Sequence, residues 1–166
     1  QACQLLSNGQ VIAAPTEAVY GLSCDFENQV ALQQILVLKR RSVDQGMIVI
    51  VSQIDQLVSW VAKDDVDRLR DQDLIVSGRA QAITWLVKPK KPVDPTVQGV
   101  HAKVAVRVTQ HKPLVCLLNQ YNRPLVSTSA NLHGHEAAKN LDMLNGYFDK
   151  KLEGVLMGKL GGFEYP

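Results

Sequence analysis

Short apolar runs alternate with stretches of helical spacing along this chain, and this alternation restricts the folds that are open to it. Six runs have the length and composition of buried strands, at residues 11–14, 47–51, 82–87, 104–108, 125–127 and 155–157. Several of them are apolar on both faces, which is typical of strands that helices cover. Helical spacing or capping residues mark 2–7, 28–39, 52–61, 113–118 and 137–144. The pattern predicts an α/β fold.

The connection between two of these strands predicts that the sheet is mixed. Residues 88–103 join the runs 82–87 and 104–108, and they are rich in proline rather than helical in pattern. Such a loop lets the two strands pair antiparallel, whereas parallel strands need a crossover, usually a helix. We therefore expect a twisted, open, mixed sheet with flanking helices. The length of 166 residues, without a repeat or a linker, predicts a single domain over 1–166.

Composition narrows the class of protein without fixing its partner. Hydrophobic residues make up 46% of the chain, enough for a core, and only 5% of residues are aromatic, so the core must be mainly aliphatic. The net charge is only +2, but basic residues gather at 39–41, 88–91 and 101–112. These clusters fit either one basic face or ordinary solvated surfaces.

Cysteine use and hydropathy predict a cytoplasmic protein with no membrane association. Cys3, Cys24 and Cys116 are odd in number and far apart, which is typical of reduced thiols rather than of a disulfide framework or a zinc site. No apolar run approaches the ~20 residues of a membrane span. No signal peptide is visible.

Polar side chains follow two of the predicted strands at the point where each strand ends. Thr16 follows a strand-ending proline, and the run Ser127–Asn131 follows the strand at 125–127. Ligands of open α/β sheets bind at the carboxyl ends of strands, where hydroxyls and backbone N–H groups suit phosphate. The same residue types are common in turns and helix caps, so each position alone has two interpretations.

Three cations are candidates for binding an anionic ligand. Lys39 and Arg41 lie at the end of a predicted helix, where the helix dipole favours cations in any case. The loop after them leads into the strand 47–51, and two cations there suit phosphate oxygens. Arg107 lies inside Val104–Val108, on one face with Ala105. A charge in such a strand has to meet a structural carboxylate, solvent or an anionic ligand.

Several common kinds of site are excluded or weakly supported. No GxGxxG follows a strand and no Walker A sequence occurs, so we do not expect a standard dinucleotide or P-loop site. The serines have no His-Asp support and no GxSxG, which argues against a serine hydrolase. His133-Gly134-His135-Glu136 lacks further ligands at metal-binding spacing, so we predict no resident metal.

Five motifs, in this order, resemble those of the YrdC-type threonylcarbamoyl-AMP synthases. They are Pro15-Thr16-Glu17-Ala18-Val19-Tyr20-Gly21-Leu22, Lys39-x-Arg41, the apolar strand after it, Val104–Val108 and Ser127–Asn131. The length is similar to that of the short bacterial form, TsaC. The resemblance implies a YrdC-like α/β fold with a concave basic cavity. It implies a nucleotidyltransferase that makes L-threonylcarbamoyl-AMP and pyrophosphate from L-threonine, bicarbonate and ATP. Transfer proteins then use the product for t6A modification of tRNA at adenosine 37.

The resemblance also implies roles for individual residues. Catalysis and contact with the triphosphate are implied for Lys39 and Arg41. Threonine binding is implied for Thr16, Arg107 and Ser127, with Arg107 on the carboxylate. Nucleotide binding is implied for Lys39, Arg41, Lys103, Ser129 and Asn131. No tightly bound cofactor is implied, and Mg²⁺ is expected to arrive with ATP because no Asp/Glu cluster suggests a built-in metal site.

The chain departs from the family pattern at a few positions. Ile50 stands where some members have a histidine, which removes any threonine contact there, and Ser42 and Gly46 replace common prolines. The family continues beyond the position of Pro166 with a serine and an arginine that contact ligands. We therefore expect that the domain is truncated at its C-terminus and binds ligands more weakly than an intact one.

Two other functions stay open at this point. Basic clusters on a concave sheet also suit a non-catalytic module that binds double-stranded RNA or tRNA through phosphates. YrdC-like domains also occur in hydrogenase-maturation enzymes that form carbamoyl-adenylate, although those proteins carry additional domains. Threonine-dependent binding of ATP would distinguish the synthase from the RNA-binding module.

Overall fold

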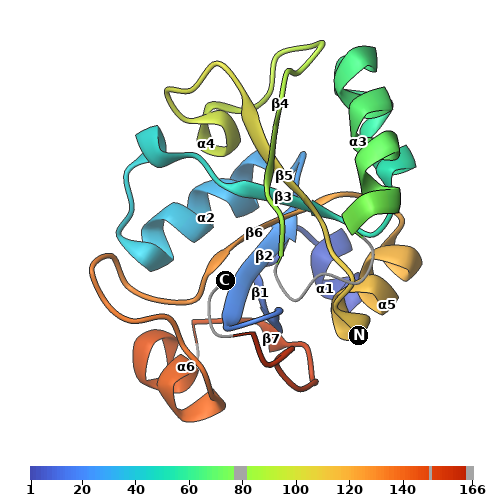
Figure 1. The fold of residues 1–166 in the computed structure, drawn as a ribbon. Helices are drawn as coiled ribbons and strands as arrows, with labels where there is room; N and C mark the ends of the chain where they lie inside the picture. Colours follow the sequence, from blue (N-terminus) through green and yellow to red (C-terminus); the bar gives the residue numbers. More distant parts are fainter. Residues whose placement is uncertain (77–81, 150, 164–166) are drawn as a thin grey trace.

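The computed structural model describes residues 1–76, 82–149 and 151–163, and it confirms the predicted α/β class with a seven-stranded sheet (Figure 1). The strands are β1 (Ile12–Pro15), β2 (Tyr20–Asp25), β3 (Ile48–Val51), β4 (Trp85–Val87), β5 (Val104–Val108), β6 (Leu125–Ser129) and β7 (Gly154–Val155). Their order across the sheet is β4-β5-β3-β6-β2-β1-β7. The pairs β3–β5 and β1–β7 are parallel, and the other neighbours are antiparallel, so the predicted mixed sheet is confirmed.

The helices surround this sheet (Figure 1). They are α1 (Ala2–Ser7), α2 (Gln29–Lys39), α3 (Lys63–Val76), α4 (Pro95–Gln98), α5 (Lys112–Tyr121) and α6 (Leu141–Phe148), with 3₁₀ turns η1 (Val43–Gln45) and η2 (Ile54–Leu57). Asn28 caps α2 as predicted, because its Oδ1 accepts from the N–H of Ala31 at 2.9 Å. Helix α2 ends as Arg40 turns into the left-handed region, with φ of 52°. This bend turns the chain toward β3.

Two predicted helices differ from the observed ones. Only the single turn η2 forms within 52–61, because residues 60–62 pair with the proline-rich segment instead: the N–H of Lys90 donates to Trp60 at 2.9 Å, and that of Ala62 donates to Lys88 at 2.9 Å. Helix α6 begins after Asn140 rather than at residue 137, since the Asn140 side chain caps it by accepting from Met143 at 2.8 Å. Four elements, β2, α3, α4 and η1, were not predicted, and α4 lies within the segment 88–103 that was expected to be a loop.

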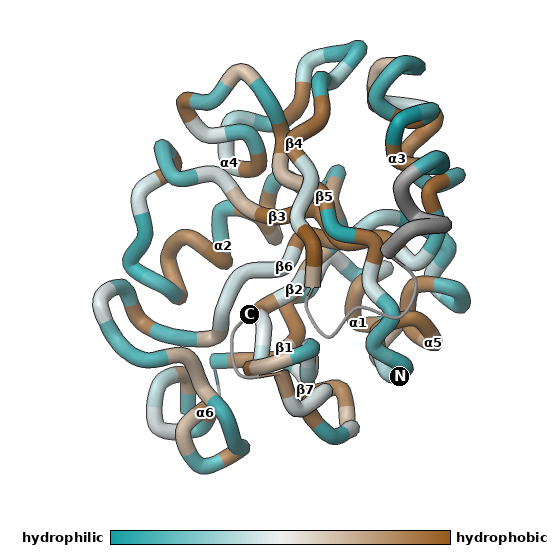
Figure 2. Tube along the Cα trace, in the orientation of Figure 1, coloured by the Kyte–Doolittle hydropathy of each residue, from teal (hydrophilic) through white to brown (hydrophobic). Residues whose placement is uncertain are grey.

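Apolar side chains form a cluster on each face of the sheet, as the apolar strands predict. The larger cluster joins the strands to α2, η2, α3, α4 and α6, and the smaller one joins β1, β3 and β6 to α1 and α5. Figure 2 shows the hydrophobic residues along the central strands and mostly hydrophilic residues on the outer turns. Alternation divides each strand between the clusters: Val49 and Val51 face the larger one, and Ile50 faces the smaller one.

Within the described ranges, no helix is both long enough and apolar enough to cross a lipid bilayer.

Candidate functional site

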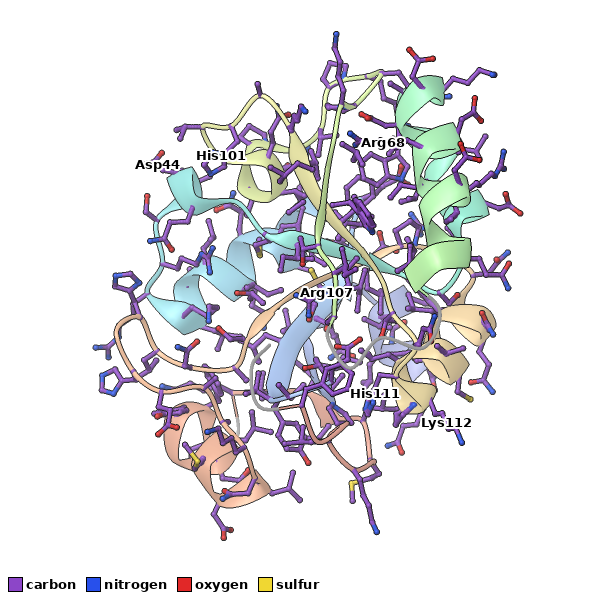
Figure 3. The ribbon with its side chains drawn as sticks, viewed as in Figure 1. Asp44, Arg68, His101, Arg107, His111 and Lys112 are labelled. Carbon is purple, nitrogen blue, oxygen red and sulfur yellow. The ribbon has the colours of Figure 1, made fainter. Side chains whose placement is uncertain are left out.

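A cavity of about 850 Å³ lies on the sheet face that carries α5, beyond the apolar cluster of that helix. Residues from β2, β3, β5 and β6 form its floor, and segments around 16–20, 45–48 and 97–103 form its walls. Figure 3 labels two lining residues: Arg107 lies near the centre of the molecule, and His101 lies beside α4. The volume lies toward the upper end of the range for small-molecule sites.

The hydroxyls of β6 reach the cavity because residues 127 and 129 point to the same face of that strand. Both Ser127 and Ser129 line the cavity. Gly21 lies opposite Ser129 on β2, and a Cβ there would come within 2.7 Å of the Ser127 Oγ. A glycine at this position therefore leaves room for the serine hydroxyl.

Thr16 lines the cavity at the end of β1, but its hydroxyl has a local partner. The Oγ1 donates to the backbone oxygen of Val19 at 2.7 Å, and the Thr16 N–H donates to the same oxygen at 3.0 Å. These bonds close the turn between β1 and β2. The structure thus shows the turn-closing role of Thr16, and its hydroxyl can still accept a hydrogen bond from a ligand.

Arg41 lines the cavity and is held by the loop that follows it. Its guanidinium donates to the Gly46 oxygen at 2.7 Å and to the Thr128 hydroxyl at 3.1 Å. Burial lowers the pKa of Arg41 from its usual value, although the group stays charged at neutral pH. The cation is therefore fixed in orientation between β3 and β6.

Lys39 and Asn131 are not among the residues that line the cavity, and they bind each other. Lys39 is only 2% exposed, and its Nζ donates to the Ser129 oxygen, to the Asn131 oxygen at 3.1 Å and to the Asn131 Oδ1 at 2.7 Å. The Ser129 hydroxyl donates to the same Oδ1 at 2.9 Å. Because burial disfavours the ammonium and Arg41 repels it, the pKa of Lys39 is lowered to about 8.

Arg107 lines the cavity from β5, and it meets a carboxylate that the sequence did not single out. Its Nε and Nη2 donate to the Thr84 hydroxyl at 3.2 and 2.9 Å, and its Nη1 lies 3.8 Å from the Glu17 Oε2. Glu17 in turn accepts from the Thr109 hydroxyl at 2.6 Å. Of the three predicted partners for Arg107, the structural carboxylate is therefore present, and the cavity leaves the arginine open to a ligand.

Sequence reasoning passed over Glu17, although a signal was available. It is a carboxylate directly after a strand-ending Pro-Thr pair, in the longest of the five motifs. Thr84 and Thr109 carry no such signal, because their importance depends on distances across the sheet.

The third predicted cation of the nucleotide site, Lys103, lines the cavity from the exposed loop before β5.

The charges around the cavity favour an anionic ligand. Among the described lining residues, Arg41, Lys103 and Arg107 are cationic and Glu17 is the one carboxylate. A recessed site with this balance concentrates anions, and its low dielectric strengthens their attraction. In the same described part of the chain, no three His, Cys, Asp or Glu residues gather as a metal site would require.

Comparison with known proteins gives the family. The family model Sua5_yciO_yrdC, described as telomere recombination, matches residues 4–163. The threonylcarbamoyl-AMP synthase of Photobacterium profundum is 34% identical over 166 residues, which cover 100% of this chain and 89% of that protein. The synthase of Methylococcus capsulatus is 38% identical over 165 residues, covering 99% and 87%.

A solved structure supports the same relationship at the level of the fold. The crystal structure of P. abyssi Sua5 complexed with L-threonine superposes with a TM-score of 0.82 over 96% of this chain and 46% of that chain, at 23% identity. The family model spans nearly the whole chain, and the relatives match over most of their own length. The chain therefore belongs to the Sua5/YciO/YrdC family, which includes these threonylcarbamoyl-AMP synthases.

Proposed function

We propose that this chain is a threonylcarbamoyl-AMP synthase, which forms L-threonylcarbamoyl-AMP and pyrophosphate from L-threonine, bicarbonate and ATP. Relatives with that name match it over nearly the full length of both chains. The observation that supports the substrate classes is one cavity that combines three cations with hydroxyls: Arg41, Lys103 and Arg107 with Thr16, Ser127 and Ser129. Such a site suits a phosphate-bearing nucleotide and a carboxylate-bearing amino acid held side by side.

In this proposal, threonine and ATP contact different side chains of the cavity. Arg107, with Thr16 and Ser127, binds threonine, and the arginine takes the carboxylate. Arg41, Lys103 and Ser129 bind ATP. Lys39 and Asn131 contribute to the nucleotide site by fixing residues 129–131, and their bonds to each other support that role.

The chemistry needs charge stabilisation more than a protein nucleophile. The threonine amine, once its ammonium has lost a proton, attacks bicarbonate to form a carbamate and release water, and a carbamate oxygen then attacks the α-phosphorus of ATP as pyrophosphate leaves. Negative charge grows on the phosphate during that step, and fixed cations and N–H donors lower its free energy. Arg41 is such a fixed cation, because the Gly46 oxygen and the Thr128 hydroxyl hold its guanidinium. Holding both substrates in one cavity also removes the entropic cost of their encounter.

The wider setting belongs to the same proposal. ATP enters as its magnesium complex, and the product passes to transfer proteins that modify tRNA in the cytoplasm. The cysteines Cys3, Cys24 and Cys116, all within the described ranges, are unpaired thiols, which suits a reducing compartment. We further propose that residues 1–166 form one domain.

Pyrophosphate release from ATP, measured with and without L-threonine and bicarbonate, tests the proposed reaction. We expect release only when both are present. Arg41→Gln should lower it at least tenfold and raise the KM for ATP, because a fixed cation at the phosphates is lost. Arg40→Gln is the matched control, since it removes the neighbouring, exposed charge and should leave the rate near that of the wild type.

Two outcomes would contradict the proposal in different ways. Wild-type turnover by Arg41→Gln would remove that residue from the site. Absence of threonine-dependent release, together with binding of double-stranded RNA, would favour the non-catalytic RNA-binding module.

A further inference from the structure

We propose that Glu17 binds the α-ammonium group of the amino-acid substrate, so that Glu17 and Arg107 together recognise the zwitterion. This inference rests on the proposed function, because it takes threonine as the substrate. It adds a specificity-determining residue: the pair would select amino acids over hydroxy acids that share the same carboxylate and side chain.

Glu17 is a buried carboxylate at the wall of the cavity. It is only 8% exposed, and it is the one carboxylate among the described lining residues. A buried carboxylate is costly unless it is paired and hydrogen-bonded. A cavity that binds anions through three cations does not need a carboxylate for them, so a cationic group of the ligand is its natural counterpart.

The hydrogen bonds of Glu17 leave one oxygen available. The Oε1 accepts from the Thr109 hydroxyl at 2.6 Å, and that hydroxyl accepts from the N–H of His111 at 3.1 Å. The Oε2 lies 3.8 Å from Arg107, which is too long for a hydrogen bond. No hydrogen-bond donor reaches the Oε2 from any described residue. An ionised carboxylate oxygen accepts two hydrogen bonds, so the Oε2 can take an ammonium.

Arg107 offers the complementary half of the pair. The Thr84 hydroxyl occupies its Nε and Nη2, and the remaining Nη1 is the nitrogen that lies near Glu17. A substrate carboxylate at Nη1 would therefore lie beside the Oε2. The carboxylate and ammonium of an α-amino acid are attached to one carbon, so a cation and an anion less than 4 Å apart match both ends.

The backbone around Glu17 is fixed before any ligand binds. The N–H of Phe163 donates to the Glu17 oxygen at 2.9 Å, and that of Gly161 donates to the Thr16 oxygen at 3.0 Å. These bonds tie the turn after β1 to the C-terminal segment. A pre-organised carboxylate binds its partner without an ordering cost, which increases its contribution to affinity.

The test compares two ligands that differ only at the amine. L-Threonine and (R)-3-hydroxybutanoate share the carboxylate and the hydroxyl, and ligand-observed NMR gives the dissociation constant of each. In Glu17→Gln we expect threonine affinity to fall at least tenfold, because a charged hydrogen bond is lost. Affinity for 3-hydroxybutanoate should stay within about twofold of the wild-type value, so the preference for threonine collapses.

Three further proteins make the test decisive. Glu136→Gln removes an exposed carboxylate that pairs with Lys139 at 3.2 Å, and it should leave both affinities unchanged. Thr109→Val keeps the Glu17 carboxylate but frees its Oε1, and it should weaken threonine selectively. Glu17→Asp should keep part of the preference for threonine, since it retains the charge. If Glu17→Gln does not fold, as judged by its melting curve, Thr109→Val decides the outcome.

The failure of this inference is distinguishable from that of the proposed function. If Glu17→Gln weakens both ligands by the same factor, Glu17 acts only by orienting Arg107 and the inference is overturned. The inference is also overturned if Glu17→Gln keeps the full preference for threonine over 3-hydroxybutanoate while the wild-type protein releases pyrophosphate. If the wild-type protein neither binds threonine nor releases pyrophosphate, the proposed function fails first.

Discussion

Lys39 illustrates how much of this site depends on the orientation of single side chains. An ammonium has three donors, and the Lys39 Nζ has three acceptors, all of them on Ser129 and Asn131. The group therefore has no free proton for a phosphate in this arrangement. Its bonds instead hold the segment that follows β6, whose Ser129 lines the cavity. The prediction that Lys39 itself meets the triphosphate requires a change of partners when ATP binds.

The buried ammonium gives a pH-dependent stability that can be measured. The pKa of Lys39 is lowered to about 8 in the folded protein, whereas the usual value of 10.5 applies in the unfolded chain. Between these values the unfolded chain binds more protons, so the contribution of this group to stability rises with pH. Below pH 8 the ammonium is present in both states, and the cost of burying it is fully in force. Unfolding in urea at several pH values measures this contribution.

The comparison with Lys39→Met isolates that group from all others that titrate. We expect the free energy of unfolding of the wild type, minus that of the variant, to increase as the pH rises from about 8 toward 10.5. Other titrating groups cancel in the difference. A difference that is flat across this window would mean that the Lys39 ammonium is not buried in the folded protein.

The residues that line the cavity could be predicted from the sequence better than the hydrogen-bond partners of those residues. Of the side chains that the five motifs indicated, Thr16, Arg41, Arg107, Ser127 and Ser129 line one cavity, whereas Lys39 and Asn131 do not. Some of their partners are local, such as Val19 for Thr16, but others could not be predicted because they lie far away in the chain. Thr84 and Thr109, for example, reach Arg107 and Glu17 only through the pairing of β4, β5 and the turn after β1.

At the scale of elements, one wall of the cavity depends on the contact between η1 and the loop after α4. The N–H of Met47 donates to Val97 at 2.8 Å, and that of Val100 donates to Asp44 at 3.2 Å. Gly99 has a φ of +65°, and a Cβ there would lie 2.4 Å from the Asp44 oxygen. An alanine at this position would therefore force the two segments apart.

We expect Gly99→Ala to destabilise the protein more than Gly134→Ala does. Gly134 has a φ of +80° with nothing within 4 Å, so its substitution costs only the backbone strain, about 1–2 kcal/mol. The clash at Gly99 should add about 1–3 kcal/mol and weaken ATP binding, because the wall is displaced. Urea midpoints and ATP titrations measure both effects. Equal losses at the two glycines would show that the wall tolerates the extra carbon.

Helices α2 and α5 were predicted from local signals, whereas strand β2, which was missed, has none. Asn28 before α2 and Pro113 in α5 are capping and N-terminal signals that act within one turn. Strand β2 contains Gly21, Ser23 and Asp25, which are poor strand formers on their own. It forms because β1 and β6 pair with it on both sides and bury every residue of it. Such tertiary pairing cannot be read from a local pattern.

At the scale of the whole molecule, the sheet joins segments from both halves of the chain. Strands β1 and β2 come from the first half, and they lie between β6 and β7 of the second half. The two apolar clusters share β1, β3 and β6, so neither cluster can be lost without disturbing the other. This arrangement favours one cooperative unfolding transition.

A destabilising substitution on one face of the sheet should therefore lower the urea midpoint reported by a probe on the other face. In a Trp85→Phe background, Trp60 is the remaining tryptophan, and it lies in the larger cluster, 4.7 Å from Phe26 between ring centroids. Leu118 is fully buried in the smaller cluster, and Leu118→Ala should cost about 2–5 kcal/mol. We expect Trp60 fluorescence and far-UV circular dichroism to shift to the same lower urea midpoint. Val37→Ala, at a residue 77% exposed on α2, should shift neither.

Separate behaviour of the two probes would contradict this prediction and the proposal of a single domain. If Leu118→Ala removed part of the circular dichroism while the Trp60 transition stayed at its original midpoint, the α5 face would unfold by itself. Because α5 also supplies Leu114 to the cavity, such a partial opening would expose the site below the global midpoint. Binding of threonine or ATP would then stabilise the circular dichroism transition alone, whereas in a cooperative domain it raises both midpoints together.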